Sequence, residues 1–137
     1  MGGAMTTAHR VLLIDDDNFF LTILADAFCG SGFEVFTARD GRDGVRSYLA
    51  NGPEVVITDL IMPVMGGVST CLEITRLAGD NPPLLILLTS MFQGMPHEHE
   101  TPDMGAKIHI PKSVQPLDVV ILVEQLLERV RLQAAGE

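Results

Sequence analysis

The chain is poor in aromatic residues, cysteine and positive charge. It has no tryptophan, one tyrosine and two cysteines, and its nine basic residues face 18 acidic ones, for a formal net charge of -9. Phosphate backbones and anionic membranes attract basic proteins, so this balance argues against direct binding to nucleic acid or to a membrane. No apolar run approaches the roughly 20 residues that span a bilayer, and MGGAMTTAHR lacks the hydrophobic segment of a secretory signal. We therefore expect a cytoplasmic protein.

The length of 137 residues is typical of one domain with one hydrophobic core. We expect residues 1–8 to be a cloning remnant and a disordered N-terminus, residues 9–133 to form the domain, and residues 134–137 to be a tail or the start of a linker. Cys29 and Cys71 lie in helix-like apolar patterns without metal-ligand spacing. This predicts free thiols that pack as small core side chains.

Short apolar runs alternate with amphipathic stretches, which is typical of an α/β protein with a parallel sheet. Five runs are predicted strands: RVLLID (10–15), EVFTA (34–38), EVVITD (54–59), LLILLT (84–89) and KIHIP (107–111). Most are continuously apolar, as strands covered on both faces are. The pattern predicts a doubly wound, five-stranded parallel sheet with helices on both faces.

Helical periodicity appears between the strands and after the last one. The clear helices are residues 18–32, 41–52, 67–79 and 115–133. The first has an apolar stripe of Phe20, Leu24, Ala27 and Phe28. The last has Pro116 near its start and an apolar stripe of Val119, Val123, Leu126 and Val130. The first three end at glycines, which suit a helix C-terminus. Residues 90–105 should hold a fourth helix, but Gly94, Pro96 and Pro102 interrupt it, and an interior proline costs about 3 kcal/mol or more. That helix is expected to be short or irregular.

Polar residues stand at the carboxyl ends of the predicted strands, where doubly wound sheets bind ligands. The first strand ends in Asp15, Asp16 and Asp17, the third in Asp59, the fourth in Thr89 and Ser90, and the fifth in Lys112. If three of these carboxylates lie about 5 Å apart, each pair repels by roughly 3 kcal/mol at an effective dielectric of about 20. A cation must neutralise them. The candidate ligands are all oxygen atoms, and no cysteine or histidine stands at these strand ends, which favours Mg²⁺.

The same residues are suited to phosphoryl transfer, which depends on positioning and charge neutralisation. Asp59 would attack phosphorus and form an aspartyl phosphate. Lys112 would hold one phosphoryl oxygen, and Thr89 with the backbone N–H of Ser90 would hydrogen-bond another. Each residue also has a structural interpretation. Asp59 alone is equally consistent with a structural role, and Asp17 or Asn18, directly before FFLTIL, is expected to be a helix N-cap.

Together these segments resemble the receiver domain of bacterial two-component response regulators, the fold that includes the chemotaxis receiver. The resemblance covers about His9 to Gln133. It rests on VLLIDDD for the acidic pair, VITDLIMPVMGG for the phosphorylated aspartate, LLTS for the switch threonine and GAKIHIPK for the lysine. It implies a flavodoxin-like strand order 2-1-3-4-5 and a signalling domain without substrate turnover beyond its own phosphorylation and slow dephosphorylation.

The resemblance also implies roles for individual residues. Asp59 would accept a phosphoryl group from a sensor histidine kinase or a histidine phosphotransfer protein. Asp16, Asp59 and the main-chain carbonyl of Ile61 would hold Mg²⁺, with Asp15 reaching the ion directly or through water. Thr89 would swing toward the phosphoryl group, and His109, where the family often has a rotating aromatic residue, would follow. The output surface would be the fourth helix, fifth strand and final helix, acting on an unknown effector domain or downstream protein, with a possible homodimer.

Several positions depart from the family pattern. The family lysine is usually followed by a cis proline, whereas Ser113 follows Lys112, and a non-proline cis bond costs about 2.5 to 4 kcal/mol; we expect a trans bond. Pro111 precedes the lysine, which suits an edge strand. Ile61 and Met91, the apolar residues that flank the site, cannot orient an attacking water, which predicts slow self-dephosphorylation.

Two other features have alternative explanations. Val120 and Ile121 widen the apolar face of the final helix, which indicates either a wide core stripe or a dimer or interdomain contact. HEHE, with His97 and His99, is more consistent with a solvated loop than with a metal site or pH sensor, because its spacing is not that of a zinc ligand set.

Two rival functions stay open. A phosphohydrolase of the haloacid-dehalogenase type would use Asp15 as its nucleophile, because LLIDDDN places Asp15 and Asp17 in a DxD arrangement. That family also needs a late acidic pair, where this chain offers a lysine. A degenerate receiver that acts only as a docking module is the other alternative, and the complete set of acids, threonine and lysine argues against it.

Overall fold

The computed structural model describes residues 8–90 and 108–135. The predicted fourth helix, Met91, His97 and His99 therefore lie outside the described residues, as do residues 1–7 of the predicted N-terminal segment.

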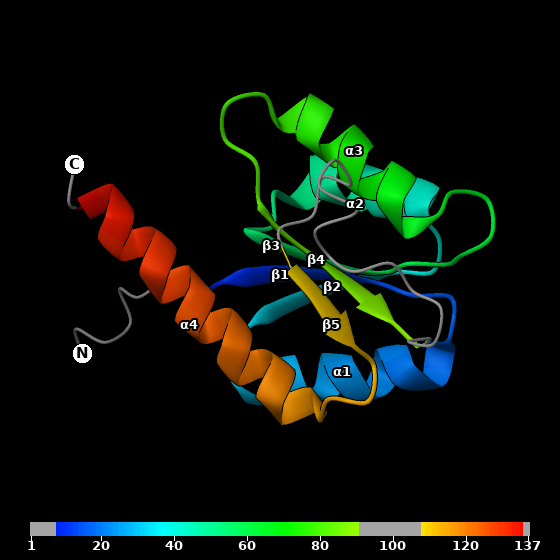
Figure 1. Cartoon of the computed structure of the whole chain (residues 1–137), viewed down its shortest axis with the longest axis horizontal. Coiled ribbons are helices and arrows are strands. Elements are labelled where there is room, and N and C mark those ends of the chain that lie inside the picture. The colour runs from blue at the N-terminus through cyan, green and yellow to red at the C-terminus, as the bar shows by residue number, and fades with distance from the viewer. Residues whose placement is uncertain (1–7, 91–107, 136–137) are drawn as a thin grey trace.

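The described chain alternates strands with helices (Figure 1). The elements are β1 (Arg10–Ile14), α1 (Asn18–Gly30), β2 (Glu34–Ala38), α2 (Gly41–Asn51), β3 (Val55–Asp59), α3 (Gly67–Ala78), β4 (Leu84–Thr89), β5 (Ile108–Pro111) and α4 (Pro116–Ala135). All strand pairs are parallel, in the order β2-β1-β3-β4-β5. This confirms the predicted doubly wound sheet and places β5 at its edge. The label α4 denotes the C-terminal helix.

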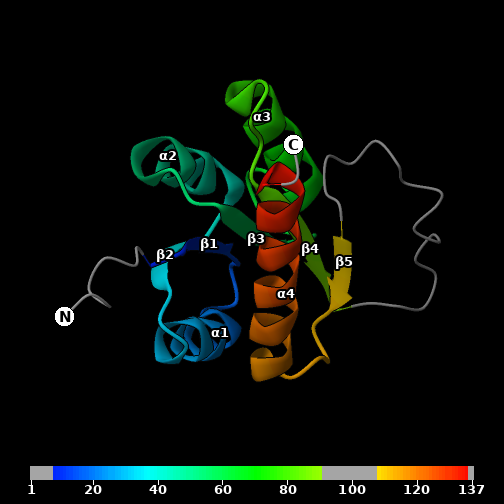
Figure 2. The ribbon, with the colours of Figure 1, turned by 90° about the vertical axis from the view of Figure 1, so that its left-hand side faces the viewer.

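Helices cover both faces of the sheet, α1 and α4 on one side and α2 and α3 on the other (Figure 2). Alternate residues of each central strand enter two separate cores: Val11 and Leu13 pack under α1 and α4, whereas Leu12 and Ile14 pack under α2 and α3. Strand side chains alternate between faces, so a sheet covered on both sides needs apolar residues at every position. This is why the strand runs are continuously apolar.

Capping groups in the sequence set the helix ends. The Asp17 side chain accepts hydrogen bonds from the backbone N–H groups of Phe19 (3.1 Å) and Phe20 (3.2 Å), which confirms it as the N-cap of α1. Asp40 caps α2 in the same way, a role that the sequence analysis did not assign. Gly52 ends α2 in the left-handed conformation, with φ of 57°, as predicted for a C-terminal glycine.

Two predictions of helix burial were wrong. Cys29 is exposed, whereas Cys71 is buried as predicted; Phe20 of the α1 stripe is partly buried against the core, beside the fully buried Leu21. Val130 is 52% exposed, because the C-terminal end of α4 projects beyond the sheet (Figure 1). A small rotation of a helix about its axis decides which of two adjacent apolar residues is buried. Periodicity alone does not fix that rotation.

The two apolar residues that widen the face of α4 differ in burial. Val120 is buried beside Val119 and Val123, as a wide core stripe requires, whereas Ile121 is exposed, as a contact surface requires. Among the described residues, no helix is long and apolar enough to cross a membrane.

Gly67, the first residue of α3, allows that helix to approach the end of β3. Its N–H donates to the Leu60 carbonyl oxygen at 2.8 Å. A Cβ atom at Gly67 would lie 2.2 Å from the Asp59 carbonyl oxygen and 2.9 Å from the Leu60 Cα atom. Only glycine fits this approach, since backbone atoms cannot move aside as a flexible side chain can.

Replacing Gly67 with alanine is expected to lower the free energy of unfolding by about 1 to 3 kcal/mol through overpacking. Gly30→Ala is the matched control, because a Cβ atom there meets nothing within 4 Å, and it should raise stability by up to about 1 kcal/mol. Urea unfolding of the two variants measures both values. Equal effects at the two glycines would contradict the close approach of α3 to β3.

Candidate functional site

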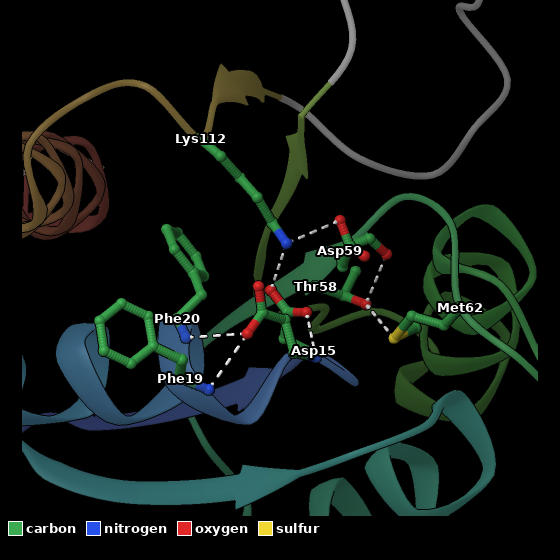
Figure 3. A network of polar contacts seen from close by, with 8 residues as sticks. Asp15, Phe19, Phe20, Thr58, Asp59, Met62 and Lys112 are labelled. Atoms are coloured by element: carbon green, nitrogen blue, oxygen red, sulfur yellow. Dashed lines mark hydrogen bonds and ion pairs between the residues drawn. The ribbon is translucent and has the colours of Figure 1, made fainter.

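The carboxyl ends of β1, β3, β4 and β5 lie along one edge of the sheet and bring the predicted polar residues together. Asp15 follows β1 directly, Asp59 is the last residue of β3, and Lys112 follows β5. Asp59 pairs in register with Leu88 of β4, so the strand ends are level. Asp15, Asp59 and Lys112 lie together at this edge (Figure 3).

Three carboxylates form an acidic cluster at this edge. One oxygen each from Asp15, Asp16 and Asp59 lie within 4.8 Å of one another. Asp15 is 2% exposed and Asp59 is 7% exposed, whereas Asp16 faces solvent. The cluster therefore has a buried side, where negative charge is poorly hydrated, and an open side at Asp16.

Lys112 is the cation that faces this cluster among the described residues. Its Nζ atom lies 2.7 Å from Asp15 Oδ2 and 3.4 Å from Asp59 Oδ1. Its side chain is 14% exposed. The Lys112 backbone N–H donates to the Thr89 carbonyl oxygen at 2.8 Å, which ties the residue after β5 to the end of β4. One ammonium thus contacts two of three carboxylates.

Burial and like charge shift the acid–base properties of the cluster. Desolvation, followed by the neighbouring charge of Asp15, raises the pKa of Asp59 from 3.8 to about 6, although Lys112 opposes this shift. Burial alone would lower the pKa of Lys112, but its contact with Asp15 and the charges of Asp15 and Asp59 outweigh burial and raise it. At neutral pH the lysine is charged, and the pocket is short of positive charge.

The loop between β3 and α3 makes a tight reverse turn beside Asp59. Val64 has a φ of 70°, which β-branched residues rarely adopt, and the Met65 N–H donates to the Pro63 carbonyl oxygen at 2.7 Å. Ile61, proposed as a carbonyl ligand, lies in this loop with an exposed side chain. The Thr58 hydroxyl donates to the Asp59 carbonyl oxygen at 3.1 Å and lies near the Met62 sulfur (Figure 3).

The remaining predicted residues lie close to the cluster. Thr89 is partly buried at the end of β4 and Ser90 is exposed directly after it. His109 is partly buried in β5, and because side chains alternate along a strand it faces away from the core residue Ile110. The Lys112–Ser113 peptide is trans, as expected, since the described residues contain no cis bond.

Phe20 is the residue of the site that the sequence analysis did not identify. It was assigned to the core stripe of α1, but its ring lies 4.6 Å from the Lys112 ammonium, measured to the ring centroid. One feature of the sequence could have indicated this role. Phe20 lies in the first helical turn after the Asp17 cap, at the same edge of the sheet as the acidic residues.

Known proteins are similar to this chain in sequence and in fold. The family model of the response regulator receiver domain matches residues 11–124. The chain is 34% identical over 112 residues to the chemotaxis protein CheY of Thermotoga maritima, covering 81% of this chain and 91% of that protein. It is 32% identical over 123 residues to the transcriptional regulatory protein PrrA of Mycobacterium tuberculosis, covering 90% of this chain but 52% of PrrA. The chain thus spans about half the length of such regulators.

Solved structures have the same fold. CheY4 of Vibrio cholerae, 24% identical, superposes with a TM-score of 0.75 over 87% of this chain and 98% of that chain, which shows the common fold. A chain of the CheX-CheY-BeF3-Mg+2 complex from Borrelia burgdorferi is 26% identical, with a TM-score of 0.74 over 87% of this chain and 89% of that chain. By the extent of the family match and by its similarity to CheY along most of both chains, this protein belongs to the response regulator receiver domain family.

Proposed function

We propose that this receiver domain accepts a phosphoryl group on Asp59, with Mg²⁺ held by Asp15, Asp16, Asp59 and the main-chain carbonyl of Ile61. The observation that carries the proposal is the buried Asp59 carboxylate, 3.4 Å from a lysine and beside two further carboxylates at the open edge of the sheet. Receiver domains are signalling domains rather than enzymes with separate substrates. The donor would be a sensor histidine kinase or a histidine phosphotransfer protein.

The acidic cluster fits a hard divalent cation. Asp15 Oδ2 is buried and pairs with the Lys112 ammonium at 2.7 Å. Three carboxylates face this one ammonium among the described residues, and carboxylate oxygens are the ligands that Mg²⁺ prefers. A similar chain belongs to the CheX-CheY-BeF3-Mg+2 complex from Borrelia burgdorferi. When bound, the ion would offset the repulsion between Asp59 and an incoming phosphoryl group.

The residues of the chain would then perform the transfer. An Asp59 carboxylate oxygen forms a bond to phosphorus while the phosphorus–nitrogen bond of the phosphohistidine breaks. The electron pair of that bond stays on the ring nitrogen, so a phosphohistidine protonated on its other ring nitrogen leaves as a neutral imidazole. The Lys112 ammonium would contact one phosphoryl oxygen. The Thr89 hydroxyl and the backbone N–H of Ser90 would hydrogen-bond another.

Signal output is also a proposal. Thr89 and His109 would move toward the phosphoryl group and alter the surface formed by the predicted fourth helix, β5 and the C-terminal helix α4. That surface would contact an effector domain or downstream protein, or a second copy of the chain, in the cytoplasm. Exposed Leu117 and Ile121 on α4 support an interface there.

The structure favours Asp59 over Asp15 as the nucleophile. Asp15 Oδ1 accepts the Asp17 N–H at 2.9 Å, and Oδ2 pairs with Lys112. Both oxygens of Asp15 are thus engaged, which argues against the haloacid-dehalogenase alternative. A docking module without chemistry would not need the charge cluster, whose repulsion opposes folding.

Incubation with a small phosphodonor and Mg²⁺ should add one phosphoryl group to the wild-type protein, as measured by intact-protein mass. Asp59→Asn and removal of Mg²⁺ should each abolish the gain, because they remove the nucleophile and the charge neutralisation. Asp26→Asn, a change at an exposed carboxylate of α1, is the control and should be phosphorylated normally. Phosphorylation that persists in Asp59→Asn and maps to Asp15 would support a hydrolase instead, and no gain in the wild type would support a docking module.

In the absence of metal, stability should fall as the pH rises from about 4 to about 6. The pKa of Asp59 is about 6 in the folded state against 3.8 ordinarily, so the folded protein binds this proton more tightly than the unfolded chain. The resulting stabilisation is complete below pH 3.8 and lost as pH rises through 6, a change of about 2 to 3 kcal/mol. Asp59→Asn should remove this component and be the more stable protein at pH 7.5. Urea unfolding in a chelator measures this, and equal wild-type and variant stability at pH 7.5 would contradict it.

Once formed, the aspartyl phosphate is expected to persist for many minutes. Ile61, two residues after Asp59, is apolar and exposed, and it offers no group to orient a hydrolytic water. Following the phosphorylated mass over time after removal of the donor measures the lifetime. Ile61→Asn should shorten it by supplying such a group, with Ile61→Val as the apolar control. A wild-type lifetime of seconds would refute the prediction.

A further inference from the structure

The ring of Phe20 lies against the ammonium group of Lys112. The Nζ atom is 4.6 Å from the ring centroid, inside the distance of about 6 Å at which an aromatic face attracts a cation. In Figure 3 the Phe20 side chain extends from α1 toward Lys112, whereas the ring of Phe19 points away. Phe19 is 76% exposed. Of these two adjacent phenylalanines, only Phe20 is directed toward Lys112.

The N-terminal cap of α1 fixes Phe20 relative to the acidic cluster. Asp17 accepts the Phe20 N–H at 3.2 Å through Oδ1, and its own N–H donates to Asp15 Oδ1 at 2.9 Å. Asp15 in turn pairs with Lys112. A closed set of contacts therefore connects the candidate metal ligand, the helix cap, the ring and the lysine.

Lys112 needs such a restraint because lysine is a point charge on a flexible four-carbon side chain. Its ammonium is nearer to Asp15, at 2.7 Å, than to Asp59, at 3.4 Å. The proline that usually follows this lysine in the family is absent, and Ser113 follows through a trans bond. The Phe20 ring lies against the same ammonium, and such a contact would limit the movement of the ammonium away from Asp59.

We propose that Phe20 is a positioning residue whose ring holds the Lys112 ammonium in reach of a phosphoryl group on Asp59. This inference rests on the proposed phosphorylation of Asp59. Phe20 also packs partly against the α1 and α4 core, so its test separates the effect of the ring face from that of apolar packing.

The contact itself can be observed without any variant. The chain has two lysines, Lys107 and Lys112, so protein labelled with ¹³C-lysine gives two sets of side-chain NMR signals. The Lys112 Hε protons should be shifted upfield by the ring current in the wild type and in Phe19→Leu, and this shift should disappear in Phe20→Leu. A wild-type Lys112 signal at the position of an unstructured lysine would overturn the proposal.

Phosphorylation kinetics test the consequence of the contact. Phe20→Leu, which keeps an apolar side chain, should slow Mg²⁺-dependent phosphorylation by a small phosphodonor about three- to ten-fold, the size of a cation–π contribution. Phe20→Tyr keeps the ring and should restore the rate, and Phe19→Leu is the matched control with an unchanged rate. Equal rates in Phe20→Leu and the wild type, or equal losses in Phe20→Leu and Phe20→Tyr, would overturn the positioning role. If the wild type gains no phosphoryl group, the proposed function fails, while the Lys112 chemical shift still decides whether the contact exists.

Discussion

The repulsion among three carboxylates at one sheet edge, balanced by Lys112, is the constraint on which the site depends. Asp15 and Asp59 are almost fully buried and Lys112 contacts both. Removing the ammonium or the carboxylates from such a cluster leaves charges of the other sign unpaired where water hydrates them poorly, and this lowers the free energy of unfolding. The cluster is therefore stable only with its lysine in place and has a remaining demand for positive charge.

The fold delivers this arrangement through ordinary features of a parallel sheet. Parallel strands end at one edge, so residues far apart in sequence meet there once the strands are in register. Gly67 then brings α3 against the Asp59 carbonyl oxygen, and the Asp17 cap orients the start of α1 beside Asp15. The contacts at the start of α3 and α1 thus also hold Asp59 and Asp15 in place.

The sequence predicted the strands and the charged residues of the site because both follow from strong constraints. A strand buried on both faces must be continuously apolar, and a charge at its end must lie at the sheet edge. The burial of Cys29 was predicted wrongly, and the contact of Phe20 with Lys112 was missed, for the opposite reason. Both residues lie on α1, where a rotation of the helix about its axis exchanges buried and exposed neighbours at a small difference in free energy. Such rotations depend on packing against α4, which the local sequence does not encode.

The absence of proline after Lys112 shows how one requirement can be met by different means. A lysine at the end of an edge strand is held on few sides, and here its backbone is tied to Thr89 while its ammonium is bounded by Asp15, Asp59 and the Phe20 ring. Three of these contacts act on the charged group itself rather than on the backbone. The position of the lysine therefore depends on the charge state of the cluster, so that any cation or phosphoryl group bound at Asp59 also changes the forces on Lys112.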